Sequence, residues 1–261
     1  MSFSADWLAL RTDADRAARN ADLAGALAEL AADREHLRVL DLGAGTGANM
    51  AATAPFLSAQ QEWVLVDADQ DLLDKVEAED GVTLTRKVHD LAGDLAPLFV
   101  ETPDLITASA FFDLCGQAWI DRIVAEAAQS NALVYAVLTY DGREVWSPAH
   151  PADAAVLDAF HADQQRDKGL GPAQGPAGAD ALAASLKAHG YRVETGRSDW
   201  ELTAEADREL ISALAEGSAN AVRATLGETA DSWLADRRAA QTVMIGHLDV
   251  LGIPPGWKVE D

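Results

Sequence analysis

The sequence has very little cysteine and no long apolar stretch. Cys115 is the single cysteine among 261 residues, which excludes an internal disulfide and any metal site built from several thiolates. No stretch approaches the roughly 20 consecutive apolar residues that a membrane-spanning helix needs, and no basic segment followed by an apolar one opens the chain. These absences lead us to expect a soluble intracellular protein, most simply one of the cytoplasm.

Positive charge is also scarce. The chain carries 20 Lys and Arg residues against 43 Asp and Glu residues, which gives a net charge of −23. Such a chain repels a polyanion, so the charge argues against DNA and RNA as substrates. A solvated acidic surface accounts for this charge, with steering of a cationic substrate as the alternative. We expect no metal site, because carboxylates and histidines do not stand at the spacing of metal ligands.

The sequence does contain a regular alternation of short apolar runs and helical segments. A helical cap is predicted over residues 1–35, and five apolar runs that are typical of strands follow it. These runs lie at 37–42, 62–67, 82–88, 104–109 and 131–140. Because they are apolar without strict alternation, they suit strands that are covered on both faces. We therefore predict an α/β fold with a doubly wound, mostly parallel sheet.

The second half of the chain, residues 141–261, is predicted to complete a seven-stranded sheet and to form the substrate side. The elements expected there are a loop after Tyr140, a helix at 153–165, a loop rich in Gly and Pro at 169–178, a helix at 179–189, a sixth strand at 191–202, a helical insertion at 203–240 and a last strand at 242–253. A single domain over 1–261 is expected, in which 36–140 form the core that binds a cofactor.

A glycine-rich turn follows the first predicted strand. Residues 41–47 read D-L-G-A-G-T-G, directly before a helix that begins near Ala48. Glycines let the backbone pass close to a ligand, and the crevice at the carboxyl ends of parallel strands is the usual ligand site. Gly43, Gly45 and Ala48 also satisfy a dinucleotide pattern, so the glycines alone do not choose the cofactor. Asp41 favours S-adenosylmethionine, since a carboxylate there repels a pyrophosphate but suits an ammonium and a sulfonium.

The segment VLDLGAGTGANM resembles motif I of the class I S-adenosylmethionine-dependent methyltransferases, and the likeness continues in order through the five strands. The resemblance implies a Rossmann-like methyltransferase fold and an enzyme with S-adenosylmethionine as its cofactor. It places Asp67 on the ribose hydroxyls and Asp90 near the adenine, although helix capping stays open for Asp90. The cofactor-binding residues that we expect are Asp41, Gly43, Ala44, Gly45, Gly47, Asp67, Ala68, Asp90, Leu91 and Ser109.

The residues that we expect near the methyl acceptor follow the fourth and fifth strands or lie in 160–178, which is predicted to close as a lid. The catalytic candidates are Asp113, Tyr140, His161, Gln164, Asp167 and Lys168. The run F-x-x-x-Q-x-x-D-K-G-x-G that begins at Phe160 resembles one in uncharacterised bacterial methyltransferases and names no substrate. The alternatives are a helix N-cap for Asp113, a half-buried strand tyrosine for Tyr140 and a solvated helix end for the lid residues.

Two aromatic residues and the cysteine complete the candidates. Phe111 and Phe112 either wall the acceptor pocket or belong to the core, whereas Cys115 is predicted to pack in an apolar run. The cap and the helical insertion are expected to roof a closed pocket, which favours a small-molecule methyl acceptor. The alternatives are a methyltransferase that acts on a protein or tRNA and a nucleotide-dependent oxidoreductase.

Overall fold

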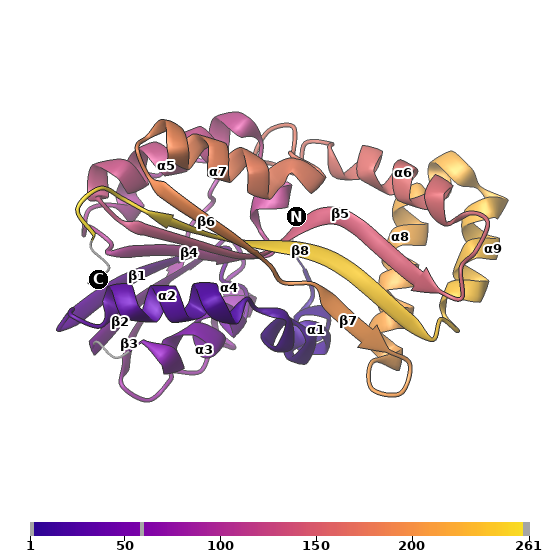
Figure 1. Cartoon of the computed structure of the whole chain (residues 1–261), viewed down its shortest axis with the longest axis horizontal. Helices are drawn as coiled ribbons and strands as arrows, with labels where there is room; N and C mark the ends of the chain where they lie inside the picture. The colour runs from indigo at the N-terminus through magenta and orange to yellow at the C-terminus, as the bar shows by residue number, and fades with distance from the viewer. Residues whose placement is uncertain (1–2, 58–59, 258–261) are drawn as a thin grey trace.

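The computed structural model describes residues 3–57 and 60–257, which fold around one eight-stranded sheet (Figure 1). The strand order is β3-β2-β1-β4-β5-β8-β6, and β7 also pairs with β8. The strands are β1 (His36–Leu42), β2 (Gln60–Asp67), β3 (Val82–Val88), β4 (Leu105–Ser109), β5 (Leu133–Ser147), β6 (Arg192–Arg197), β7 (Trp200–Thr203) and β8 (Thr242–Ile253). β1 to β5 are parallel, whereas β8 is antiparallel to β5, β6 and β7. The predicted doubly wound, mostly parallel sheet is confirmed, with eight strands in place of seven.

Helices cover both faces of the parallel part of the sheet (Figure 1). One face carries α5 (Gln117–Ser130) and α7 (Gly178–Ala188), and the other carries α2 (Ala21–Ala31), α3 (Ala48–Thr53) and α4 (Gln70–Leu73). Successive strand residues point to opposite faces, so Leu105 and Ile106 of β4 belong to two different buried cores. Burial on both faces explains why the strands read as continuous apolar runs in the sequence.

The N-terminal cap consists of α1 (Ala5–Ala18) and α2, and residues 1 and 2 of the predicted cap lie outside the described part. Asn20, which lies between the two helices, is hydrogen-bonded to Asp249 of β8. The buried carboxylate of Asp249 accepts hydrogen bonds from the backbone N–H groups of Asn20 at 2.9 Å and Leu138 at 2.7 Å. Burial raises the pKa of Asp249, and these hydrogen bonds partly offset that rise. The position of α1 over the sheet is therefore set by a buried carboxylate.

β5 is longer than predicted. It continues past Tyr140 to Ser147 and stays paired with β8, so the expected loop after Tyr140 is wrong. The Asp-Gly pair at 141–142 forms a bulge in which three residues, 141–143, lie opposite Gly246. Gly142 has a φ of 88°, and Asp141 accepts a hydrogen bond from the backbone N–H of Arg143 at 3.0 Å. The Asp-Gly turn signal thus forms a bulge within a paired strand and does not end the strand.

The predicted sixth strand at 191–202 is wrong in one respect, because the chain forms β6 and β7 with an interruption at Ser198 and Asp199. The carboxylate of Asp199 accepts the backbone N–H of His247 at 3.2 Å. A side chain thereby takes the place that a backbone carbonyl of the neighbouring strand would otherwise fill. Both short strands still pair with β8.

The predicted helical insertion at 203–240 is confirmed as α8 (Arg208–Leu226) and α9 (Glu228–Arg237). With α6 (Asp153–Gln164), these helices surround the extended ends of β5, β7 and β8 at the right of Figure 1. A third buried core forms there, in which the rings of Trp146 and Trp233 meet edge to face at 5.4 Å. The helices of the described ranges include none long and apolar enough to span a membrane.

Candidate functional site

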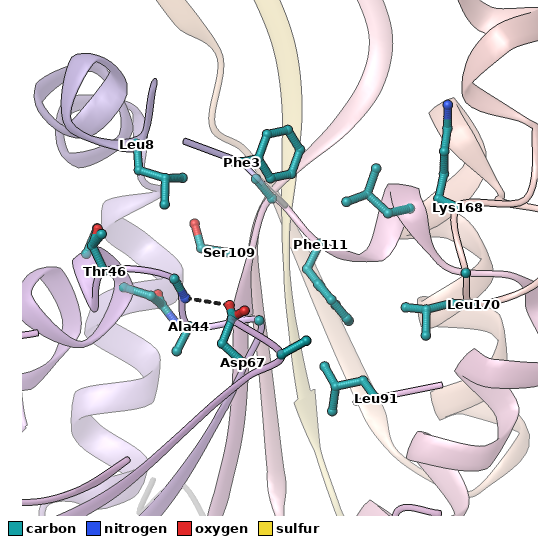
Figure 2. Close-up of a pocket in the computed structure, with 18 of the residues that line it drawn as sticks. Phe3, Leu8, Ala44, Thr46, Asp67, Leu91, Ser109, Phe111, Lys168 and Leu170 are labelled. Carbon is teal, nitrogen blue, oxygen red and sulfur yellow. Dashed lines mark hydrogen bonds between the residues drawn. The ribbon is translucent and has the colours of Figure 1, made fainter. Parts of the chain in front are cut away.

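The larger of two adjoining pockets lies at the carboxyl ends of the parallel strands and has a volume of about 500 Å³ (Figure 2). Its wall is formed by the glycine turn, the ends of β2 and β4, residues of α1 and the segment 168–170. The predicted cofactor-side residues that line it are Gly43, Ala44, Gly45, Asp67, Ala68, Asp90, Leu91 and Ser109. Asp41 and Gly47 belong to the same turn but do not line this larger pocket.

The glycine turn has a backbone that other residues rarely adopt. The φ angle is 64° at Gly43, 54° at Gly45 and 81° at Gly47. A Cβ on Gly45 would stand 3.0 Å from a methyl carbon of Leu8 in α1, and a Cβ on Gly47 would stand 2.8 Å from Val76. Gly45 therefore keeps the space beside the pocket free, whereas Gly47 serves the turn and the packing beneath it.

Asp67, the last residue of β2, faces the glycine turn. Its carboxylate accepts the backbone N–H of Gly45 at 2.9 Å, drawn as a dashed line in Figure 2, and that of Asp69 at 2.9 Å. These two bonds use different oxygens and leave each with further accepting capacity toward the pocket. The side chain is thus held rigidly, and it can still accept a pair of hydroxyl donors.

Asp41 is placed differently from the expectation, because it lies behind the turn and is fully buried. One oxygen accepts the side-chain amide of Asn49 at 2.7 Å, and Asn49 itself lines the larger pocket. The other oxygen has no hydrogen-bond partner within residues 3–57 and 60–257. Burial raises the pKa of Asp41 to about 7, although the Asn49 bond lowers it. Asp41 is therefore linked to the pocket by its hydrogen bond with Asn49 and does not line the pocket itself.

Beyond β3, Asp90 and Leu91 form another part of the pocket wall. The exposed carboxylate of Asp90 accepts the backbone N–H of Ala92 at 2.9 Å and so closes a turn. The helix-cap alternative for Asp90 is wrong, because the next short helix, η2 (Ala96–Leu98), begins after Leu95. The carbonyl of Leu91 accepts the indole N–H of Trp119 at 2.7 Å, which fixes this backbone. Asp90 keeps a place on the pocket wall while it stabilises its own loop.

The predicted lid segment is pinned to the core in this structure. Gly116 donates its backbone N–H to the carbonyl of Leu170 at 3.0 Å, and Gln174 donates to Cys115 at 2.9 Å. A Cβ on Gly116 would stand 2.8 Å from the Leu170 carbonyl oxygen, so the two backbones touch. Residues 168–170 form part of the wall of the larger pocket here, and the closing of the segment as a lid stays a prediction.

The two charged candidates in that segment do not lie together. Asp167 is exposed, accepts the backbone N–H of Gly169 at 2.7 Å and of Gly171 at 3.1 Å, and lines neither of the two adjoining pockets. Lys168 lines the larger pocket, and its ammonium pairs with Asp163 at 3.1 Å. Only Lys168 therefore lies on a pocket wall, and the contact of either residue with an acceptor stays a prediction.

A smaller pocket of about 150 Å³, called the aromatic pocket below, adjoins the larger one. The aromatic residues that line it are Phe3, Trp7, Tyr140, Trp146, Phe160, Trp200 and His247. Its polar lining residues include Asp113, Glu144 and Gln164. Four residues line both pockets, namely Phe3, Arg11, Ala110 and Leu114. The two pockets thus share one boundary beneath α1.

Tyr140 links two polar groups at the wall of the aromatic pocket. Its hydroxyl donates to Glu144 at 2.8 Å and lies 3.0 Å from Nε2 of His161, while the Trp146 indole donates to Glu144 at 3.1 Å. Because the single hydroxyl proton goes to Glu144, the His161 ring must donate to the hydroxyl. Burial raises the pKa of both Tyr140 and Glu144. His161 supports Tyr140 from behind and does not itself line the pocket.

Asp113 lines the aromatic pocket and does not cap the next helix. The N-cap of α5 is Gly116, and Asp113 lies in the short turn η3 (Phe112–Leu114) before it. The side chain is 8% exposed, and burial raises its pKa to about 6. Gly178 packs directly on its backbone, since a Cβ there would stand 2.7 Å from the Asp113 Cα. The helix-cap alternative for Asp113 is therefore wrong, and its role in catalysis stays a prediction.

The remaining aromatic candidates divide between the pocket and the core. Phe111 lines the larger pocket, whereas Phe112 is buried and meets Phe111 edge to face at 5.9 Å. Cys115 is buried, and burial raises the pKa of its thiol, which agrees with the predicted packing role. No cluster of three metal-binding side chains occurs in the part of the chain that the structure describes.

Comparison with known proteins bears on the fold. No family model matches the sequence, and no curated protein matches it significantly. A cyclopropane-fatty-acyl-phospholipid synthase-like protein from Lactobacillus casei matches the structure with a TM-score of 0.58 at 12% identity, over 97% of this chain and 95% of that one. The YcgJ protein from Bacillus subtilis matches with a TM-score of 0.52 at 17% identity, over 90% and 99%. A candidate methyltransferase from Bacillus halodurans matches with a TM-score of 0.50 at 14% identity, over 88% and 98%.

The chain has the class I methyltransferase fold. This result confirms the fold that the segment VLDLGAGTGANM implied. Within this fold the larger pocket takes most of its wall from the ends of β2 and β4 and from the segments that follow the first four strands, and the aromatic pocket takes most of its wall from the antiparallel half around β5 and β8.

Sequence reasoning missed several residues that line the pockets, above all Glu144, Arg11 and Asn49. Glu144 lay in the segment predicted to be a loop, and Arg11 lay in a helix predicted only as a cap. Asn49 offered one usable signal, since it is a polar residue on the first turn of the helix after the glycines. Trp7 and Trp200 gave none, because their partners in the pocket are distant in the sequence.

Proposed function

We propose that this chain is an S-adenosylmethionine-dependent methyltransferase that acts on a small-molecule acceptor. The observation that carries the proposal is the junction of the two pockets: a larger one beneath a glycine turn with a ribose-type aspartate, and a smaller one that shares Phe3, Arg11, Ala110 and Leu114 with it. A group-transfer enzyme needs this arrangement, because donor and acceptor have to be held in contact away from water.

The charge of the larger pocket favours a sulfonium cofactor over a dinucleotide. The carboxylates of Asp15, Asp67 and Asp90 line it. Its two long cationic side chains are already paired, Arg11 with Asp15 at 2.8 Å and Lys168 with Asp163 at 3.1 Å. Since Asp15 is used by Arg11, the negative charge of the wall comes from Asp67 and Asp90. Such a surface attracts a cation and offers a pyrophosphate little compensation for the repulsion.

The residues of the larger pocket fit this cofactor part by part. Asp67 would accept the ribose hydroxyls, the backbone of Gly43 to Gly45 would lie along the methionine part, and Asp90 with Leu91 would border the adenine. The cofactor supplies a methyl group activated by its sulfonium. The chain has to align donor and acceptor, and such alignment alone can contribute about 7 to 11 kcal/mol.

A binding experiment separates this proposal from an oxidoreductase. We expect S-adenosylhomocysteine to bind in calorimetry and NAD not to bind. Asp67→Ala should weaken S-adenosylhomocysteine about 10-fold or more, because a hydrogen bond to a charged group is worth about 1.5 to 3 kcal/mol. Asp80→Ala, at an exposed aspartate outside both pockets, is the matched control and should bind normally. Tight NAD binding, or an unchanged affinity in Asp67→Ala, would contradict the proposal.

A further inference from the structure

Two residues on the wall of the aromatic pocket each carry a buried side-chain oxygen that lacks a hydrogen-bond donor. Oδ1 of Asp113 and Oε1 of Gln164 have no partner anywhere in residues 3–57 and 60–257. Both residues line the pocket, one from the turn before α5 and the other from the end of α6. A buried acceptor without a donor costs about 1 to 3 kcal/mol, so the pocket is arranged for a ligand that donates hydrogen bonds.

The charge of the pocket narrows the ligand further. Its anionic side chains are Asp113 and Glu144, and its cationic one is Arg11. The Arg11 guanidinium donates to Asp15 through Nε at 2.8 Å and Nη2 at 3.0 Å, so its charge is balanced by a residue outside this pocket. Burial lowers the pKa of His247 to about 3, with Arg11 as the second cause, so this ring is neutral. The aromatic pocket therefore has an excess of negative charge.

The walls of the pocket suit an organic cation. The rings of Trp7, Tyr140, Trp146, Phe160 and Trp200 line it. Aromatic faces attract ammonium groups, and this attraction grows when the site excludes water. Arg11 already lies 5.0 Å from the ring centroid of Trp200, so one of these faces binds a cation within the protein itself.

The volume limits the size of the ligand. About 150 Å³ is well below the roughly 300 to 1,000 Å³ of sites for drug-sized ligands. A peptide or a nucleoside does not fit such a space, whereas a short aliphatic amine does. The pocket lies beside the larger one across Ala110 and Leu114, so a ligand here sits next to the proposed cofactor site.

We propose that the aromatic pocket binds the ammonium-bearing part of a small aliphatic amine as the methyl acceptor, and that Asp113 and Gln164 accept the hydrogen bonds of its N–H groups. Asp113 would also take up the proton that the ammonium has to lose before its nitrogen lone pair can bond to the methyl group, and the pair of the broken carbon–sulfur bond would stay with S-adenosylhomocysteine. This inference rests on the proposed methyltransferase function, which it deepens by naming the substrate class. Glu144 adds negative charge to the wall. Its two oxygens already accept hydrogen bonds, one from Tyr140 and one from Trp146.

Calorimetry on the protein saturated with S-adenosylhomocysteine tests the inference. The probes are three series of equal carbon skeleton, from two to eight carbons: primary amines, the corresponding alcohols and the corresponding carboxylates. We expect the best amine to bind at least about 10-fold more tightly than its alcohol and its carboxylate, and to quench tryptophan fluorescence. An alcohol or carboxylate that binds as tightly, or no binding by any amine of the series, overturns the inference.

Two variants make the test specific to the named residues. Asp113→Asn and Gln164→Leu should each weaken amine binding by about 10-fold or more and keep S-adenosylhomocysteine affinity within about twofold. Asp158→Asn is the control, because Asp158 is an exposed aspartate of the same helix α6 and lines neither pocket. Normal amine binding by both pocket variants contradicts the inference. Failure of S-adenosylhomocysteine binding in the unmodified protein contradicts the proposed function instead, so the two failures are distinguishable.

Discussion

The buried carboxylate of Asp41 accepts a hydrogen bond from the side-chain amide of Asn49 at 2.7 Å, and Asn49, not Asp41, lines the larger pocket. Because burial raises the pKa of Asp41 from 3.8 to about 7, the folded protein binds a proton there that the unfolded chain releases. The stability contribution of protonated Asp41 is complete below about pH 4 and is lost as the pH rises through about 7.

Asp41→Asn removes this titration and should change the pH dependence of stability. At pH 8 the variant should be more stable than the unmodified protein, by up to about 4 kcal/mol for a shift of about three pKa units. At pH 4 that advantage should disappear, since Asp41 is then protonated in the folded protein. Thermal unfolding at both pH values measures the difference, and a gap of equal size at both would show that Asp41 does not titrate as described.

Gly45→Val should abolish S-adenosylhomocysteine binding in a protein that still folds. The φ of 54° is unfavourable for a β-branched residue, and the added side chain would meet Leu8 beside the pocket. Calorimetry checks the binding and circular dichroism checks the fold. Gly25→Ala is the control, because Gly25 lies in α2 with nothing within 4 Å of a Cβ and should leave binding intact. Retained tight binding in folded Gly45→Val would mean that the turn does not approach the ligand.

Lys168→Met should affect stability more than cofactor binding. Its ammonium pairs with Asp163, where burial raises the pKa of the carboxyl but bonds from Lys168 and Arg166 outweigh it and lower the pKa overall. In Figure 2 this ammonium lies at the far side of the pocket from Asp67. We expect a loss of roughly 0.5 to 1 kcal/mol at pH 7 and S-adenosylhomocysteine affinity within about twofold.

The pH dependence of the Lys168→Met defect identifies its cause. Because the pKa of Asp163 is depressed in the folded protein, the stability from this pair is present above about pH 4 and is lost as the pH falls through the folded-state value. Urea unfolding at pH 7 and pH 3 should therefore show a smaller defect at pH 3 than at pH 7. A loss of cofactor affinity larger than the loss of stability would assign Lys168 to ligand binding.

Amine binding should weaken in acid, because protonation of Asp113 removes the charge that attracts the cation. With a pKa of about 6 for Asp113, affinity should be about 10-fold lower at pH 5 than at pH 7.5. The other titratable or charged groups on the wall are Arg11, Tyr140, Glu144 and His247. Asp113→Asn should bind the amine weakly at both pH values. If that variant kept the full pH dependence, Glu144 and not Asp113 would be the responsible group.

The parallel half of the molecule could be predicted from the sequence because its signals are local. The inner strands are covered on both faces, as Leu105 and Ile106 of β4 illustrate, and such apolar runs are easily recognised. The glycine turn was equally readable, since Gly43 and Gly45 both adopt the positive φ that favours glycine. Asp67 followed from its place at the end of the second strand, and the structure places it on the wall of the pocket.

The antiparallel half could not be predicted because long-range pairing decides it. The Asp141–Gly142 pair is a turn signal on its own, yet pairing with β8 turns it into a bulge. At the break between β6 and β7, the Asp199 carboxylate accepts a hydrogen bond from the backbone N–H of His247, which is distant in the sequence. The walls of the aromatic pocket, such as Trp7 and Trp200, come from opposite ends of the chain and look like ordinary core residues in the sequence.

The separation of the two pockets along the chain has an evolutionary consequence. Apart from the shared boundary and residues 168–170, the larger pocket is built by α1 and the chain up to Phe111, and the aromatic pocket is built by Trp7 and the chain after Ala110. Mutations in β5, α6 or α8 can therefore change the aromatic pocket while the glycine turn and Asp67 of the larger pocket stay as they are. The aromatic pocket can thus change in evolution independently of the larger pocket.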